Sequence, residues 1–68
     1  MTLSDYCKHL GWSAADLARN AAINEKTARK ALNGESVSHK VAQDIAKAIS
    51  YYMGTRVQVG EIEGLNVS

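Results

Sequence analysis

Residues that start helices and residues that end them alternate at short intervals along positions 1–54, so this chain can form only short helices. Two pairs, Thr2 with Asp5 and Ser13 with Asp16, have the spacing of a capping box, in which two side chains satisfy amides at a helix start. The further starts and stops are the N-cap residues Asn24 and Ser38 and the glycines Gly11, Gly34 and Gly54. The pattern predicts four helices.

Apolar residues recur within these segments at the spacing of one helix face, which predicts a single shared core. The predicted core faces are Leu3, Tyr6, Cys7 and Leu10; then Leu17, Ala18 and Ala21; then Ala28, Ala31 and Leu32; and finally Val41, Ile45, Ala48, Ile49 and Tyr52. Trp12 is expected to pack beside them, and Tyr51 and Tyr52 to lie between the core and a dimer surface. The fold class predicted for residues 1–54 is all-α.

The tail, residues 55–68, changes period. Apolar and polar residues alternate from Thr55 to Val59, which is typical of a strand, and Gly60 and Gly64 interrupt the remainder of the tail. An unpaired strand edge binds another strand readily. We therefore expect the tail to be a strand-like dimerisation element attached to a domain of residues 1–54.

The chain of 68 residues has room for one small core and few means of reinforcing it. Cys7 is its single cysteine, so no internal disulfide can form, which favours a cytoplasmic location. His9 and His39 lie far apart, and the sequence predicts neither a metal site nor a cofactor. No apolar run reaches the length of a membrane span, and the first residues lack the pattern of a signal peptide. We expect no membrane contact, and dimerisation as the reinforcement.

Charge is distributed unevenly along the chain. The formal net charge is only +1, but all eight basic residues lie at or before Arg56, together with five of the acidic ones. Residues 1–56 therefore carry +3, and the two remaining carboxylates, Glu61 and Glu63, follow them. This distribution permits a basic face.

The second and third predicted helices are joined by a tight link around residues 21–23, the arrangement of a helix-turn-helix. In the third helix Lys26, Lys30 and Asn33 lie opposite the apolar face. Glu25 and Arg29 lie on one flank and Thr27 on the other. Lysine can donate to guanine, asparagine pairs with adenine, and glutamate accepts from cytosine, so this face suits the major groove of DNA.

Residues 13–34 resemble the helix-turn-helix of the phage repressor and Cro family. Leu17-Ala18, Ile23, Asn24 and Asn33-Gly34 match that family's pattern in register, and the resemblance extends over residues 3–54. It implies a four-helix lambda-repressor-like domain that binds double-stranded DNA of a specific sequence. It further implies a transcriptional repressor that acts as a homodimer on a pseudo-palindromic operator.

The resemblance also implies roles for individual residues. Glu25, Lys26 and Lys30 match positions that contact base edges, and the start of the second helix, Ser13 and Ala14, matches a phosphate contact. The loop after the third helix and the start of the fourth would contact the DNA backbone. The complete candidate DNA-binding set is Ser13, Asn24, Glu25, Lys26, Thr27, Arg29, Lys30, Asn33, His39 and Lys40.

Two positions depart from the family pattern. Ala14 stands where a glutamine or similar donor is usual, so one phosphate contact is missing. Ala22 stands where the turn usually has glycine. Ala22 must therefore either adopt a left-handed conformation, at a cost of roughly 1–2 kcal/mol, or relax the turn.

The same residues allow alternative interpretations. Glu25 can pair with Arg29 at i,i+4 instead of contacting a base, and Lys26 and Lys30 can form an ordinary solvated face. A different class of function is a protein-interaction module with a protein partner, such as an antitoxin. No catalytic constellation or phosphate-binding loop is present, so we do not expect an enzyme.

Overall fold

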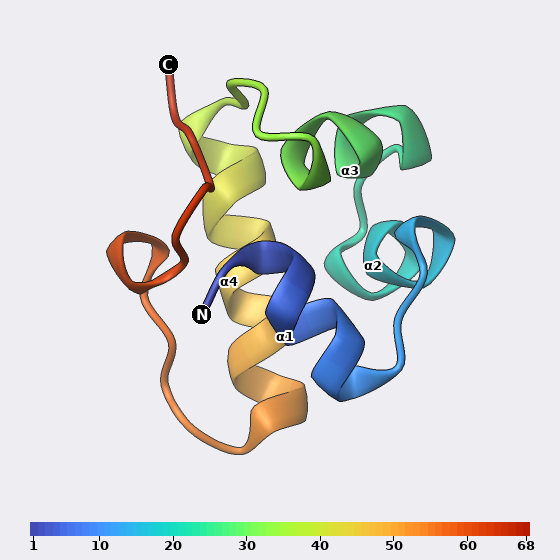
Figure 1. Ribbon diagram of the computed structural model, residues 1–68, viewed down its shortest axis with the longest axis vertical. Coiled ribbons are helices and arrows are strands. Elements are labelled where there is room, and N and C mark those ends of the chain that lie inside the picture. Colours follow the sequence, from blue (N-terminus) through green and yellow to red (C-terminus); the bar gives the residue numbers. More distant parts are fainter.

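The computed structural model describes residues 1–68 as four α-helices and one short 3-10 helix (Figure 1). The elements are α1 (Leu3–Leu10), α2 (Ala14–Ala21), α3 (Glu25–Leu32), α4 (His39–Met53) and η1 (Val59–Glu61). Figure 1 shows α2 and α3 on one side of the long α4, the tail on the other side, and α1 across its middle. The predicted all-helical class and the number of helices are confirmed. None of the helices is both long and apolar enough to cross a membrane.

All four predicted helix starts form as expected. Thr2 and Ser13 each cap a helix within a complete capping box, with Asp5 and Asp16 as the reciprocal acceptors. The side chains of Asn24 and Ser38 accept from the amides of Lys26 and Val41. Because each cap satisfies amides that would otherwise lack a partner, these residues fix where the helices begin.

The core consists of apolar side chains alone, with no buried polar residue. Most members of the predicted faces are buried, with Leu17, Ala28, Ile45 and Ile49 fully inaccessible. The prediction for α4 is partly wrong, because Tyr52 is 51% exposed and Ala42 and Ala46 are buried. Trp12 packs against the core and is half-buried.

The tail is not the strand that the sequence predicted. Residue 55 is a bend, residues 56–58 have no regular secondary structure and pair with no strand, and the chain then turns through η1. Three tail residues, Val57, Ile62 and Leu65, are buried in the same core as the helices. The 3-10 turn at η1 breaks the period-2 pattern of the tail. Burying these three residues requires a fold-back onto α4, and this covers the Ala46 side of that helix.

Two isolated bridges hold the tail in place. Glu63 pairs with Thr2 at the chain start, and Val67 pairs with Val37 between α3 and α4. The N-terminal ammonium also lies 3.1 Å from the Glu63 carboxylate. The tail thus connects the start of the chain to the loop after α3.

Candidate nucleic-acid interface

Helices α2 and α3 are joined by three residues, Ala22, Ile23 and Asn24. Ala22 adopts φ 57° and ψ 43°, and it is the single non-glycine residue with a positive φ. The Ile23 amide then donates to the Ala18 carbonyl at 2.9 Å, which closes α2, and the Ile23 side chain packs against the core. The expected left-handed conformation at Ala22 is confirmed.

The same closure ends α1 and α3, but there glycine occupies the left-handed position. After Gly11, the Trp12 amide donates to the Cys7 carbonyl at 2.8 Å, and after Gly34 the Glu35 amide donates to the Lys30 carbonyl at 2.9 Å. Each is the six-to-one hydrogen bond of a Schellman motif. Ala22 therefore takes the glycine position of a motif that the chain builds three times.

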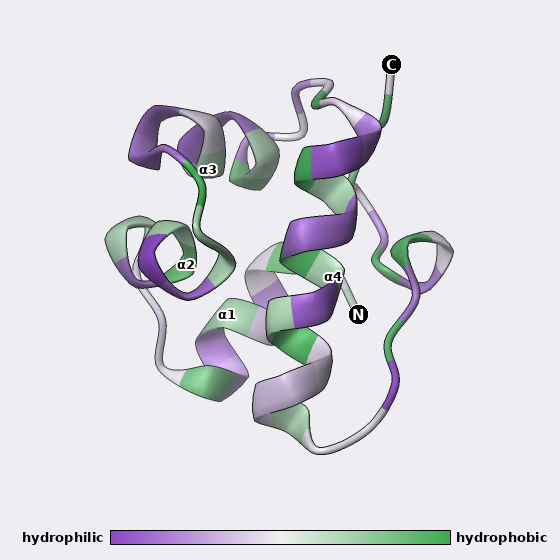
Figure 2. Cartoon of the chain, turned by 180° about the vertical axis from the view of Figure 1, so that it is seen from behind, coloured by the Kyte–Doolittle hydropathy of each residue, from purple (hydrophilic) through white to green (hydrophobic).

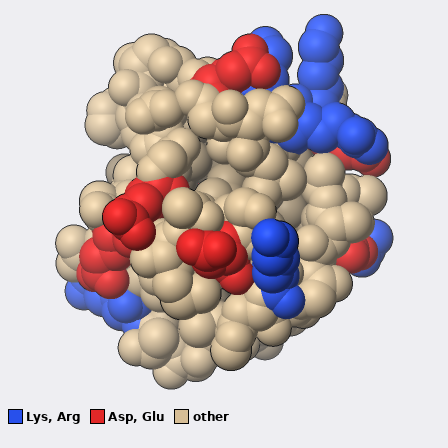
Figure 3. Space-filling view, viewed as in Figure 1, with Lys and Arg blue, Asp and Glu red and all other residues tan.

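Helix α3 has one apolar face and one polar face. Ala28 and Ala31 are buried, and their small side chains bring the α3 backbone close to its neighbours. Lys26, Lys30 and Asn33 are exposed on the opposite side. Lys and Arg side chains project from the end of the molecule that carries α3 (Figures 1 and 3).

The charges on α3 divide into a pair and two unpaired cations. The Arg29 guanidinium donates to the Glu25 carboxylate, with Nε 3.1 Å from Oε2, so the i,i+4 interpretation of Glu25 describes this structure. Neither Lys26 nor Lys30 belongs to an ion pair, and Thr27 is half-buried on the flank of the helix. The net outward charge of α3 therefore comes from the two lysines.

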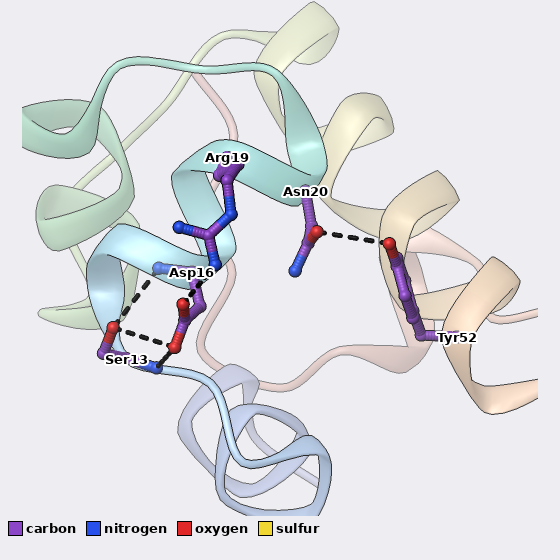
Figure 4. A network of polar contacts seen from close by, with 5 residues as sticks. All are labelled: Ser13, Asp16, Arg19, Asn20 and Tyr52. Carbon is purple, nitrogen blue, oxygen red and sulfur yellow. Dashed lines mark hydrogen bonds and ion pairs between the residues drawn. The ribbon is translucent and has the colours of Figure 1, made fainter.

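Two candidate residues serve as helix caps. The Ser13 hydroxyl donates to the Asp16 carboxylate at 3.1 Å, and Arg19 donates to the same carboxylate (Figure 4). Hydrogen bonds from the Ser13 amide, from Arg19 and from the Ser13 hydroxyl hold the pKa of Asp16 below its ordinary value. The side-chain oxygen of Asn24, Oδ1, likewise caps α3 and accepts from the Lys26 amide at 2.9 Å. Ser13 thus has no free hydroxyl donor, whereas Asn24 keeps its side-chain NH₂.

The remaining candidates lie after α3. Asn33 ends α3, and His39 and Lys40 begin α4; all three are exposed. The Lys40 ammonium lies 3.0 Å from the Asp44 carboxylate, one helical turn further on. The α3–α4 loop and the start of α4 lie at the same end of the molecule as α3 (Figure 1).

Sequence reasoning missed two contacts that brace this region. Asn66 in the tail donates from its side-chain amide to the Gly34 carbonyl at 2.6 Å, beside the end of α3. The Tyr52 hydroxyl donates to the Asn20 side chain at 3.2 Å and so links α4 to α2 (Figure 4). Asn66 lies outside any periodic segment, so no sequence signal identified it. The Trp12 ring supports Tyr52 edge to face, with ring centres 5.2 Å apart.

Helix α3, its two unpaired lysines and the adjoining loop form the candidate interface, with the caps of α2 and α3 fixing the angle of the helices. Comparisons of the chain with protein-family models, with curated proteins and with solved structures found no match.

Proposed function

We propose that the chain is a lambda-repressor-like helix-turn-helix domain that binds double-stranded DNA of a specific sequence and regulates transcription. The observation that carries this proposal is the placement of α3. Two buried alanines hold the helix against the body, and the unpaired Lys26 and Lys30 project from its exposed face. A small apolar back with long donors in front is the form of a helix that enters the major groove.

Seven of the ten candidate residues have a direct DNA contact in this proposal. Lys26 and Lys30 donate to guanine edges, and Glu25 accepts from cytosine when Arg29 turns to a phosphate. Asn33, His39 and Lys40 contact the DNA backbone. Their place beside α3, at one end of the molecule, supports a common DNA-facing surface.

Length supports a homodimer. An eight-residue helix is about 12 Å long and spans only a few base pairs. Two copies on a pseudo-palindromic operator, with recognition helices about 34–36 Å apart, double the sequence that is read. Such a dimer represses transcription by occluding the promoter.

The test is selection of bound sequences from a pool of random duplexes, followed by binding titrations at several salt concentrations. We expect a recurring sequence with two related halves, bound at least about a thousandfold more tightly than a scrambled duplex. Equal affinity for selected and scrambled duplexes would reduce the basic face to a general electrostatic surface. The protein-interaction function would then be the better explanation of the fold.

A further inference from the structure

A groove runs between α4 and residues 56–59 of the tail. Its volume is about 610 Å³, with Ala46, Val57 and Val59 among its apolar lining and Lys47, Tyr51 and Arg56 among its exposed lining. Figure 2 shows α4 in front, with the tail on one side of it and α2 and α3 on the other. The groove thus lies on the tail side of α4, across that helix from α3.

The fold holds the two walls of this groove together. The Ser50 hydroxyl, on α4, donates to the Ala46 carbonyl at 2.7 Å and accepts from the Val57 amide at 2.8 Å. The Ser50 hydroxyl therefore links the tail to α4 by a hydrogen bond in the middle of the groove lining. The groove is therefore present in the folded chain before any partner binds.

Two basic side chains that form no ion pair line this groove. Arg19, Arg29 and Lys40 are neutralised by carboxylates one helical turn away. The basic side chains that form no ion pair are Lys26 and Lys30 on α3, Lys8 on α1 beside Asp5, and Lys47 and Arg56. Lys47 and Arg56 both line the groove, and no carboxylate lines it.

An exposed aromatic ring lies at the groove and packs on a second ring. Tyr51 is 79% exposed, the highest fraction of any large hydrophobic residue in the chain. Its ring packs edge to face on Tyr52, with centres 5.1 Å apart, and Tyr52 is in turn hydrogen-bonded to Asn20. A tyrosine next to an arginine and an apolar floor is favourable for protein binding, because tyrosine and arginine are enriched at interface hot spots.

We propose that this groove binds an acidic segment of a partner protein that carries an apolar or aromatic anchor residue. Its carboxylates pair with Lys47 and Arg56, and its anchor packs between Tyr51 and the apolar floor. Charge complementarity selects this occupant, because the groove has two unpaired cations and no acid. The smaller groove on the other side of Lys47 and Tyr51 is lined by Asp44, which repels such a segment.

A protein segment fits this groove better than nucleic acid does. DNA presents phosphates along its whole surface and has no side chain that could fill the apolar hollow lined by Ala46, Val57 and Val59. A duplex bound to α3 lies across α4 from the groove. The partner can therefore bind while α3 contacts DNA, which links the proposed regulator to a second protein.

The experiment uses the full chain and a fluorescein-labelled peptide in which Leu and Phe are separated by pairs of Glu or Asp. A peptide with Gln and Asn in place of the acids serves as the control ligand. We expect the acidic peptide to bind saturably and the control peptide not to bind. Amide shifts in ¹H–¹⁵N spectra should be confined to residues 43–51 and 56–59. Lys47→Glu and Arg56→Glu should each weaken binding at least about tenfold, the usual cost of losing a charge-assisted contact. Tyr51→Ala should also weaken it.

The matched control is Lys8→Glu, which reverses an unpaired cation away from the groove and should change peptide affinity less than about twofold. The selected DNA duplex, titrated in parallel, should bind the groove variants and Lys8→Glu alike. Absence of binding at about 1 mM peptide, equal binding of the amide peptide, or equal weakening by Lys8→Glu would overturn the proposal. Peptide-induced shifts on α3, or DNA displacing the peptide from the groove, would overturn it as well. The peptide titrations, the amide control peptide and the Lys8→Glu comparison use no DNA, so they test the groove even if the proposed DNA-binding function fails.

Discussion

The side-chain amide of Asn66 donates a 2.6 Å hydrogen bond to the main-chain carbonyl of Gly34, across a separation of 32 residues. Gly34 is the left-handed residue that closes α3. The Asn66 carbonyl also accepts from the Val37 amide at 2.9 Å, so one tail residue holds the loop at both ends. The tail therefore braces the exit from α3 through contacts within a single chain.

Replacing Asn66 with Ala should weaken DNA binding more than it weakens folding. The Gly34 carbonyl is exposed and regains water, so we expect a loss of about 0.5–1.5 kcal/mol in the free energy of unfolding. The freed loop must be ordered again on DNA, which lowers affinity for the selected duplex. Gln58→Ala, which removes an exposed tail amide that makes no side-chain hydrogen bond, is the control in urea melts and binding titrations. Identical duplex affinities for the two variants would contradict the bracing role.

Deletion of residues 55–68 should unfold the protein. A free dimerisation strand would leave a folded monomer behind, but Val57, Ile62 and Leu65 are 6%, 3% and 8% exposed in the core. Burial of each such side chain contributes roughly 1.5–3 kcal/mol, and a domain of this size has only about 3–10 kcal/mol in total. Far-UV circular dichroism of the truncated chain decides the question. A cooperative thermal transition near that of the full chain would show that the helices need no tail.

Ala22→Gly should stabilise the protein by up to about 1 kcal/mol. Glycine removes the steric cost of the left-handed conformation at φ 57°, although it increases the entropy of the unfolded chain. Gly11→Ala is the mirror experiment, because Gly11 has φ 73° and a Cβ there would meet no atom within 4 Å. That variant should lose about 1–2 kcal/mol through backbone conformation alone. Urea melts that rank Ala22→Gly below the parent chain would mean that unfolded-state entropy outweighs the strain.

The capping aspartates should make the protein lose stability in acid. Hydrogen bonds from the amide and hydroxyl of Thr2 hold the pKa of Asp5 below its ordinary value, as those from Ser13 and Arg19 do for Asp16. A carboxyl group whose pKa is lowered in the folded state stabilises the fold at pH values above its unfolded-state pKa of about 3.9. That contribution to stability is lost as the pH falls through the lower pKa of the folded state.

Asp16→Asn should therefore be less stable than the parent at pH 7 and lose less stability between about pH 4 and pH 2. Glu35→Gln removes an exposed carboxylate that makes no ion pair and should behave like the parent chain. Urea midpoints measured across this pH range test both variants. Parallel curves for Asp16→Asn and the parent would remove the aspartate cap as a cause of acid sensitivity.

The helices were predictable because their determinants are local. Caps such as Thr2 with Asp5 act within one turn, and the faces of α1 to α3 follow the helical period. The tail was not predictable in this way. Ile62 and Leu65 are buried by α4 and the chain start, and alternation over Thr55–Val59 carries no information about those distant partners.

The candidate site divides along the same line. The exposure of Lys26 and Lys30 and the Glu25–Arg29 pair follow from positions within one helix. The Lys40–Asp44 pair is also local, but the family resemblance implied only a contact with the DNA backbone for Lys40. The groove joins residues on the two sides of the turn at Gly54; the sequence predicted that the helix ends there, but not that the tail folds back along it.

The two lysines that flank the loop should differ in what they do to DNA. Lys30 projects from the exposed face of α3, so Lys30→Ala should cost roughly 1–3 kcal/mol on the selected duplex and relax preference at one base position. Lys40 begins α4, and its ammonium is already 3.0 Å from Asp44, so DNA must compete with that carboxylate. Lys40→Ala should weaken binding to every sequence alike and lower the salt slope by about one unit.

Glu25→Gln completes the series. Without the carboxylate, Arg29 loses its partner and is free for a phosphate, so affinity for scrambled duplexes should rise. Discrimination should fall at any position where Glu25 accepts from cytosine, because glutamine presents a donor as readily as an acceptor. Binding titrations of the three variants on selected and scrambled duplexes, at three or more salt concentrations, separate base contacts from phosphate contacts. If Lys30→Ala and Lys40→Ala weaken both duplexes equally, α3 reads no bases and its lysines act only as charge.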